Sequence, residues 1–207
     1  MMDRNVLVEC ADLGKRYGPR WLFRGLELQI HSGESLVIVG ENGSGKSTLL
    51  KILAGVVEPS EGRTSFLLNG DKAQSRRSLI GWSAVEQSLY ATLTVEEHLR
   101  FIADVRGVQL ARGHFDRFGL NARERQLARE LSTGLRQRLR LAMAALGDPP
   151  ILLLDEPGSN LDEKGKAILA DLLDDRKGIT VIATNDEREK TFGNRLLCLG
   201  ERSESRV

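Results

Sequence analysis

The sequence predicts an α/β fold: a mainly parallel sheet flanked by helices, with an N-terminal antiparallel β layer and a small inserted helical lobe. Three short runs, at residues 35–39, 151–155 and 180–184, are almost continuous in apolar residues, and polar or glycine-rich chain follows each. Such runs are typical of parallel strands that helices cover on both faces. The N-terminal sequences VLVECADL and RGLELQI alternate apolar with polar residues instead, which predicts antiparallel strands with one wetter face.

The composition is that of one globular domain with a sizeable core. The 207 residues are 41% hydrophobic and 29% charged, and their formal net charge of +1 favours neither nucleic acid nor anionic lipid. No apolar run approaches the roughly 18 residues that cross a bilayer, and the N-terminus lacks the apolar block of a signal peptide. We therefore expect one cytoplasmic domain over residues 1–207. Cys10 and Cys198 are too isolated for a zinc site or a disulfide framework, and we expect both to be small buried side chains.

A helical lobe is expected at about residues 86–131, between two parts of a catalytic core at about 1–85 and 132–207. Thr94 and Glu97 have the spacing of a capping box, and apolar residues recur after them at helical spacing. The second half of the lobe is rich in arginine. We interpret it as a solvated surface, because acidic residues interrupt the positive charge; a face for nucleic acid is the alternative.

A phosphate-binding loop follows the first apolar run. The sequence GENGSGKST fits the pattern GxxxxGK[ST] between a predicted strand and a predicted helix. Gly43 and Gly45 let successive backbone N–H groups point at phosphate oxygens, and the helix N-terminus favours the anion. Lys46 supplies a positive charge at the β- and γ-phosphates, and Ser47 offers a hydroxyl to Mg²⁺. The predicted nucleotide-binding residues of this loop are Gly40, Glu41, Asn42, Gly43, Ser44, Gly45, Lys46, Ser47 and Thr48.

An acidic pair ends the second apolar run. Asp155 and Glu156 lie at the carboxyl end of a predicted parallel strand, at the sheet edge that also carries the phosphate loop. Asp155 is predicted to hold Mg²⁺ together with Ser47, directly or through water, and Glu156 to activate the attacking water as general base. The alternative is an ordinary turn or a helix cap.

These motifs, in this order, resemble those of the nucleotide-binding subunits of ABC transporters, which are P-loop NTPases. The resemblance covers almost the whole chain, and it is looser toward compact haem-exporter subunits. Tyr17 resembles the aromatic residue that stacks on adenine, the sequence LSTGLRQRL from Leu131 resembles the signature LSGGQ, and SNLD, ending at Asp162, resembles the D-loop. The resemblance implies ATP and Mg²⁺ as ligands.

The signature also has a physical interpretation. Ser132 and Gly134 stand at the start of an apolar helix, where a hydroxyl and free backbone N–H groups form an anion site. This helix start is not expected to reach the chain's own phosphate loop. The resemblance implies that it meets the γ-phosphate of ATP on a second cassette, identical or different, so that two ATP molecules lie between two cassettes.

Three positions depart from the family pattern. Leu135 replaces the last glutamine of the signature. The glutamine of the Q-loop falls near Val85, with Glu86 and Gln87 as alternatives. Asn185 follows the third apolar run, where the family has a histidine that contacts the γ-phosphate. An asparagine amide can donate a hydrogen bond to that phosphate but cannot carry a positive charge, and the alternative is that Asn185 only caps a loop.

Three functions compete on this basis. The first is an ATPase subunit on the cytoplasmic face of a membrane, where a separate integral membrane subunit supplies the transport path and docks on the lobe. The second is a soluble ABC-type ATPase that acts on nucleic acid or ribosomes. The third is an ATP-binding module with little or no turnover, which Leu135 and Asn185 favour but Lys46, Asp155 and Glu156 oppose. We expect slow hydrolysis, and the sequence does not indicate the cargo.

Overall fold

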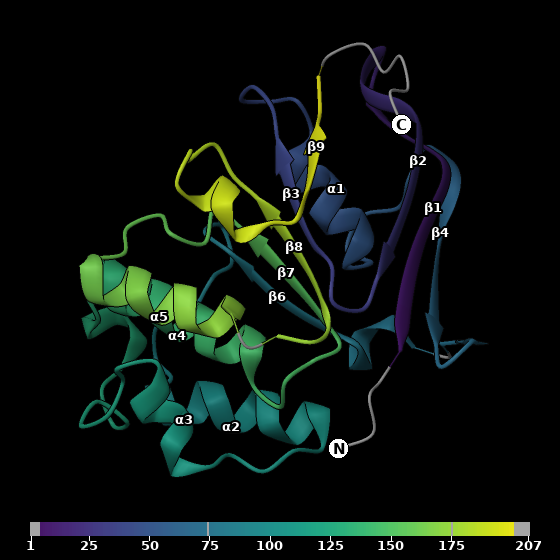
Figure 1. Cartoon of the computed structure of the whole chain (residues 1–207). Coiled ribbons are helices and arrows are strands. Elements are labelled where there is room, and N and C mark those ends of the chain that lie inside the picture. The colour runs from purple at the N-terminus through teal and green to yellow at the C-terminus, as the bar shows by residue number, and fades with distance from the viewer. Residues whose placement is uncertain (1–4, 74, 175, 201–207) are drawn as a thin grey trace.

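Two sheets and the helices around them form the layers of the molecule (Figure 1). The structure is a computed structural model that describes residues 5–73, 75–174 and 176–200. Its antiparallel sheet has the strand order β2-β1-β4-β5, and its parallel sheet has the order β6-β7-β8-β3-β9. The predicted α/β fold, with an antiparallel layer beside a parallel sheet, is therefore confirmed.

The antiparallel sheet is built around its first strand. β1 (Val6–Tyr17) pairs with β2 (Arg20–His31) on one side and with β4 (Glu61–Leu68) on the other, and β5 (Asp71–Lys72) completes the sheet. Burial alternates along the first residues of β1. This period of two places one face of the strand on the core and the other toward water, as the alternating sequence predicts.

The parallel sheet contains all three of the predicted apolar strands. Its strands are β3 (Ser35–Val39), β6 (Ile80–Ala84), β7 (Ile151–Asp155), β8 (Ile179–Ala183) and β9 (Arg195–Cys198). β7 and β8 are buried along their whole length, because helices and the antiparallel sheet cover them. The third predicted run is shifted by one residue.

The strand register brings three segments to one edge of this sheet. Ala183 of β8 pairs with Ile38 of β3 on one side and with Asp155 of β7 on the other. The chain after each strand therefore emerges at the same level. The phosphate loop follows β3, Glu156 follows β7, and Asn185 follows β8.

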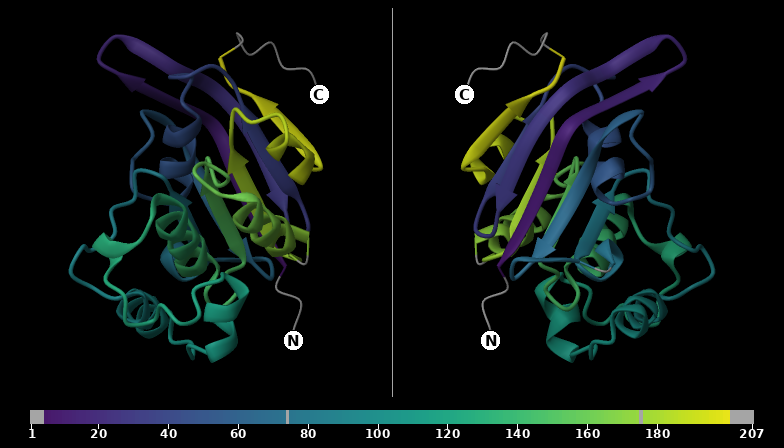
Figure 2. Two further views of the ribbon diagram at one scale, coloured as in Figure 1. Left: turned by 90° about the vertical axis from the view of Figure 1, so that its left-hand side faces the viewer. Right: turned by 90° about the vertical axis from the view of Figure 1, so that its right-hand side faces the viewer.

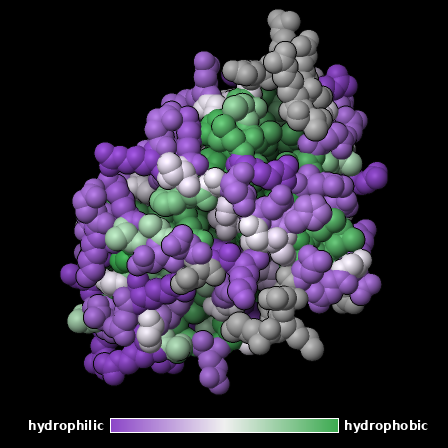
Figure 3. Space-filling model, in the orientation of Figure 1, coloured by the Kyte–Doolittle hydropathy of each residue, from purple (hydrophilic) through white to green (hydrophobic). Residues whose placement is uncertain are grey.

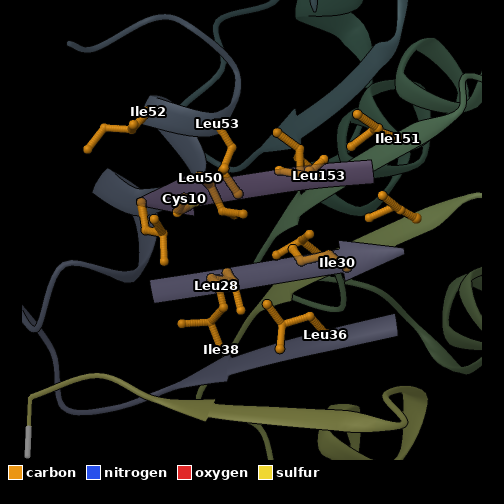
Figure 4. Packing of buried hydrophobic residues seen from close by; sticks show 14 of the residues in the cluster. Cys10, Leu28, Ile30, Leu36, Ile38, Leu50, Ile52, Leu53, Ile151 and Leu153 are labelled. Atoms are coloured by element: carbon orange, nitrogen blue, oxygen red, sulfur yellow. The ribbon is translucent and has the colours of Figure 1, made fainter. Parts of the chain in front are cut away.

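Side chains of the parallel sheet alternate between two hydrophobic cores. Leu36 and Ile38 of β3 belong to the core shared with the antiparallel sheet and α1 (Lys46–Leu53), whereas Val37 belongs to the core on the opposite face. Figure 4 shows the first core, in which Leu28 and Ile30 from β2 lie over side chains of β3. Burial on both faces fixes the register of β3, because a slip of one residue would exchange the two cores.

The second core is covered by helices. These are α2 (Val95–Arg106), α3 (Arg112–Arg117), α4 (Thr133–Ala145) and α5 (Glu163–Asp174). The described residues also form the short 3₁₀ helices η1 (Arg76–Ser78), η2 (Ala128–Glu130) and η3 (Glu189–Phe192). In Figure 1, α1 lies between the two sheets, while α4 and α5 lie on the other side of the parallel sheet.

The segment at 86–131 holds two α-helices, α2 and α3, and the 3₁₀ helix η2, which are joined by loops rather than forming a continuous helix. The predicted capping box is confirmed: Glu97 N–H donates to Thr94 Oγ1 at 3.2 Å, and Thr94 N–H donates to Glu97 Oε2 at 2.7 Å. Gly107, with φ of 64°, ends α2 in the left-handed conformation. The helices of this segment lie at the end of the molecule opposite the tip of the β1–β2 hairpin (Figure 2).

Several arginines of this region bind backbone carbonyl groups. Arg106 donates to the carbonyls of Met143 and Ala144 at 3.2 and 3.0 Å, and Arg140 donates to the carbonyl of Gln87 at 2.8 Å. Arg106 thereby satisfies carbonyls that have no helical partner at the end of α4. These guanidinium groups are occupied inside the protein.

The two cysteines differ, which corrects the expectation that both are buried. Cys10 is buried in the first core, and burial, with Glu27 nearby, raises the pKa of its thiol to about 12. Cys198 is exposed, because it ends the edge strand β9.

Hydrophilic residues dominate the face in Figure 3, and within the described ranges no helix has the length and hydropathy to cross a membrane.

Candidate functional site

The phosphate loop has the backbone that its glycines predict. Gly40 has φ of 152°, and a Cβ atom there would lie 2.2 Å from the carbonyl oxygen of Leu199. Gly45, with φ of 106°, is the N-cap of α1, and a Cβ atom there would press on Phe23. Both positions therefore require glycine. The loop curls back from β3 and delivers the chain to the N-terminus of α1.

Lys46 is a buried cation at the start of α1. Its side chain is almost covered, and Nζ donates to the carbonyls of Gly40 at 2.7 Å and Glu41 at 3.2 Å. Within the described parts of the chain Lys46 has no carboxylate partner at ion-pair distance. A buried positive charge at a helix N-terminus without a counter-charge is suited to an anion such as phosphate.

The phosphate loop and the acidic strand end are in direct contact. Ser47 Oγ donates to Asp155 Oδ1 at 3.0 Å. Burial raises the pKa of the Asp155 carboxyl, while the bond from Ser47 and the charge of Lys51 oppose this shift. A hydroxyl and a carboxylate side by side match the oxygen ligands that Mg²⁺ takes from a protein when water and phosphate complete its shell. Ser47 and Asp155 therefore fit the predicted magnesium site.

Glu156 lies in a tight turn directly after β7. Its φ of 48° is the left-handed conformation, which is uncommon for a residue with a side chain. Burial raises the pKa of its carboxyl, the N–H of Asn185 lowers it, and the charge of Asp155 raises it again. A carboxylate with a raised pKa is a stronger base, which suits the predicted activation of water.

Asn185 contacts the phosphate loop. Its Nδ2 donates to Asn42 Oδ1 at 2.8 Å, across 143 residues of sequence. The loop that follows is capped by other groups, since Asp186 N–H donates to Thr184 Oγ1 at 3.0 Å and Arg188 N–H donates to Asp186 Oδ1 at 2.8 Å. The side chain of Asn185 thus contacts the phosphate loop, while these two capping bonds are made by other residues.

The three candidates for the Q-loop lie in different environments. Glu86 forms an ion pair with Lys51 at 2.8 Å, and both charges act on the pKa of Asp155. Gln87 is turned inward, and its buried Oε1 has no hydrogen-bond partner within the described residues. Val85 is partly exposed. Of the three side chains, that of Glu86 is the one whose charge reaches the acidic pair.

The signature residues line a cavity that is separate from the cavity beside the phosphate loop. Ser132 is the N-cap of α4, where its Oγ accepts the N–H of Leu135 at 3.3 Å. This open cavity of about 560 Å³ is lined by Ser132, Gly134, Leu135 and Arg138, among others. The cavity beside the phosphate loop, of about 630 Å³, shares no lining residue with it. Ser132 and Gly134 therefore lie apart from the phosphate loop of the same chain, which agrees with the expectation that this helix start does not reach it.

The predicted adenine contact lies outside the cavity beside the phosphate loop. Tyr17 is exposed at the end of β1, with Lys15 Nζ 5.0 Å from its ring centre. Residues of β2 line that cavity instead, and Trp21 is one of them. The guanidinium carbons of Arg16 and Arg24 lie 5.6 and 4.7 Å from the centre of its ring. Sequence reasoning missed Trp21, although an aromatic residue four positions after Tyr17 could have indicated it.

The D-loop contacts the signature helix of the same chain. Asp162 forms an ion pair with the buried guanidinium of Arg138, which lowers the pKa of the Asp162 carboxyl. Gln137 Nε2 donates to the carbonyl of Pro157 at 3.1 Å. Sequence reasoning missed Arg138 and Gln137, although both lie inside the predicted signature helix. Their polar type at positions that face the core was the available signal.

Comparison with known proteins agrees with this geometry. The family described as ABC transporter matches residues 23–159 of the chain. The chain belongs to the ABC transporter family. It is 34% identical to the cytochrome c biogenesis ATP-binding export protein CcmA of Cupriavidus pinatubonensis, over 94% of this chain and 89% of that protein. Proteins of this family bind and hydrolyse ATP.

The chain is also similar to a plant protein and to a solved cassette structure. The chain is 30% identical to the chloroplastic protein TRIGALACTOSYLDIACYLGLYCEROL 3 of Arabidopsis thaliana, but it spans only 55% of that protein's length. Its fold matches a dimeric ATP-binding cassette in a post-hydrolysis state bound to ADP and phosphate, with a TM-score of 0.79 and 26% identity over 93% of this chain and 94% of that one. ABC cassettes thus occur as nucleotide-bound dimers.

Proposed function

We propose that this protein is the ATP-binding and hydrolysing subunit of an ABC transporter, and that ATP closes a dimer of cassettes coupled to a separate membrane subunit. The contact between Ser47 and Asp155 carries the proposal. It joins an anion site to an acidic strand end, the arrangement that phosphoryl transfer requires. Asn185 lies against the same loop.

Each residue at this edge has a task in the proposed reaction. The ammonium of Lys46 moves from the carbonyls of Gly40 and Glu41 to the β- and γ-phosphates of ATP. Ser47 and Asp155 hold Mg²⁺, which neutralises charge on the phosphates. Glu86 serves at the Q-loop position, and the exposed ring of Tyr17 stacks on adenine when ATP binds.

Hydrolysis is carried out by the carboxylate beside the magnesium site. Glu156 accepts a proton from the attacking water, and the Asn185 amide donates to the γ-phosphate in place of its present acceptor, Asn42 Oδ1. A second cassette contributes its Ser132 and Gly134 to the same phosphate. Two ATP molecules are then enclosed between two cassettes, and hydrolysis opens the dimer again.

A set of exposed apolar side chains on and just before the helical segment is the proposed docking surface for the membrane subunit, on the cytoplasmic face of the membrane. This docking surface consists of Val85, Tyr90, Phe101 and Val105, whose exposed fractions are 37%, 67%, 56% and 69%. Phe101 and Val105 lie one turn apart on α2. Tyr90 packs beside His98, three residues before Phe101, with ring centres 6.3 Å apart. Neighbouring exposed apolar side chains mark protein contacts.

Neither alternative gains comparable support. Arg106 and Arg140, which lie on either side of the arginine-rich half of the lobe, donate to backbone carbonyl groups, so these two guanidinium groups are already engaged within the protein. A module without turnover would not need Glu156 held with a raised pKa beside Asn185. The direct contact of Asn185 with the phosphate loop supports a role in hydrolysis.

The membrane partner is tested by extraction of native membranes in detergent. We expect the wild-type protein to co-purify with an integral membrane protein identified by mass spectrometry. The double variant Phe101→Glu and Val105→Glu should lose this partner and keep ATP binding, because two charges would be buried at the interface. Val56→Glu, which changes an exposed apolar side chain on another surface, is the control. Retention of the partner by the double variant would refute the docking surface.

Turnover tests the role of Glu156. Glu156→Gln should lower kcat by about a hundredfold or more, since the amide cannot accept the proton. ATP-bound dimers should accumulate in this variant when size is measured by light scattering. If the wild-type protein, with its membrane partner present, hydrolyses ATP no faster than this variant, the proposed ATPase activity is refuted.

Asn185 is tested by two substitutions. Asn185→Ala should lower kcat roughly tenfold, because one hydrogen bond to a charged phosphate is lost. Asn185→His should maintain or raise kcat, because the imidazole also donates and can carry a proton. Steady-state ATPase assays of purified protein provide both values. An unchanged kcat in Asn185→Ala would show that the amide does not act on the phosphate.

A further inference from the structure

A buried carboxylate beside the site has no role in the proposed reaction. Glu189 begins η3, four residues after Asn185, and is 5% exposed. Its Oε1 accepts the N–H of Gly158 at 2.8 Å, whereas its buried Oε2 has no hydrogen-bond partner within the described part of the chain. Burying an incompletely satisfied carboxylate costs folding free energy, so its presence calls for an explanation.

The residues around Glu189 belong to the segment at 184–189 and to the turn that follows Glu156. The Thr184 hydroxyl lies between the carboxylates of Glu156 and Glu189 and has one proton to donate. In this structure the Thr184 hydroxyl donates to Glu156 Oε2 at 3.5 Å, so Glu189 Oε2 receives no hydrogen bond from it. Glu189 N–H donates to the carbonyl of Asp186 at 3.1 Å, which ties Glu189 to the segment that carries Asn185.

The absence of a side chain at Gly158 allows the Glu189 carboxylate to lie close to its backbone. A Cβ atom at Gly158 would lie 2.1 Å from Glu189 Oε1, and the three nearest heavy atoms outside the adjoining residues all belong to Glu189. The φ angle of Gly158 is not in the left-handed region, so its backbone conformation does not itself require glycine. The carboxylate of Glu189 is the reason that a side chain does not fit.

The turn that contains Gly158 is held from both sides. On one side Glu189 binds the N–H of Gly158, and on the other Arg138 binds Asp162. The start of the signature helix also touches this turn, because a Cβ atom at Gly134 would lie 3.0 Å from the carbonyl oxygen of Asn160. Residues 157–162 thus lie between the segment at 184–189 and the signature helix.

We propose that Glu189 is a positioning residue that links the segment at 184–189 to the turn at 157–162. A change at Asn185, where this chain senses its own γ-phosphate, then moves Gly158 and, through Arg138, the signature surface offered to the second cassette. This inference rests on the proposed function, because it needs two nucleotide sites.

Two substitutions of Glu189 separate a tether from simple filling of space. Glu189→Ala removes the acceptor and should lower kcat about tenfold, with KM for ATP within about twofold, because nucleotide binding itself does not use Glu189. Glu189→Gln keeps an acceptor oxygen for the Gly158 N–H and should recover most of the loss. Glu163→Ala, in an exposed side chain at the start of α5, is the control that keeps wild-type values. Wild-type kcat in Glu189→Ala, or equal losses in the two Glu189 variants, would overturn the proposal.

A double-mutant cycle tests the contact itself. Gly158→Ala displaces the Glu189 carboxylate from the other side, so it should lower kcat as Glu189→Ala does. The double variant should lose no more than either single variant, because the same contact is already broken. Additive losses would overturn the proposal.

Hydrogen exchange tests the tether without any turnover. The amide hydrogen of Gly158 in the nucleotide-free protein, followed by NMR, should exchange about tenfold faster in Glu189→Ala and at the wild-type rate in Glu189→Gln. This result does not depend on ATP hydrolysis, so it stands even if the wild-type protein proves inactive. An unchanged rate in Glu189→Ala would refute the tether and leave the proposed function untouched.

Discussion

The register of the parallel sheet is the constraint on which the site depends. Pairing of β3 and β7 with β8 places Ile38, Ala183 and Asp155 at one level, so the next residues along each strand meet at one edge. The bond from Ser47 to Asp155 is possible only in this register. Because β3 is buried on both faces, a slip of one residue would disrupt two cores as well as the site.

This arrangement brings charged side chains together at one sheet edge, where burying them costs free energy. Lys46 and Asp155 are both almost covered, and Glu156 has a raised pKa with a left-handed backbone. Each feature costs folding free energy. A nucleotide with Mg²⁺ would supply the counter-charges that the protein lacks, and this accounts for a site that is polar but well fixed.

The chain carries two half-sites that do not meet within one molecule. The cavity at Ser132 and the cavity beside the phosphate loop have no lining residue in common, and each is predicted to bind an anion near the start of a helix. A second copy can bring one against the other. The turn at 157–162 touches Glu189 on one side and Arg138 on the other, so it is the part of the chain through which the two half-sites can affect each other.

The features that the sequence predicts well are local ones. Runs of apolar residues identify β3, β7 and β8, and the spacing of Thr94 and Glu97 identifies the start of α2. The phosphate loop and the acidic pair are also continuous in sequence, and the strand order of a parallel fold is enough to bring them together. The sequence also identified Asn185 as the residue after the third strand. Only the structure shows that its amide turns toward Asn42.

Features that depend on contacts between distant segments were not predictable. Glu189 resembles any polar residue of an exposed loop until its bond to Gly158 is seen. Glu86 and Gln87 are adjacent in sequence, and only their surroundings show that one pairs with Lys51 and the other turns inward. Cys198 follows apolar residues, yet it is exposed because β9 is an edge strand. Local patterns do not specify which strand lies at an edge.

The most direct test of the shared site is to mix two inactive variants. Lys46→Ala removes the phosphate-loop cation and Ser132→Arg blocks the signature, so each homodimer lacks two working sites. A mixed dimer has one intact site, built from the phosphate loop of the Ser132→Arg chain and the signature of the Lys46→Ala chain. The account predicts that ATPase activity appears on mixing. A mixture no more active than its separate components would contradict it.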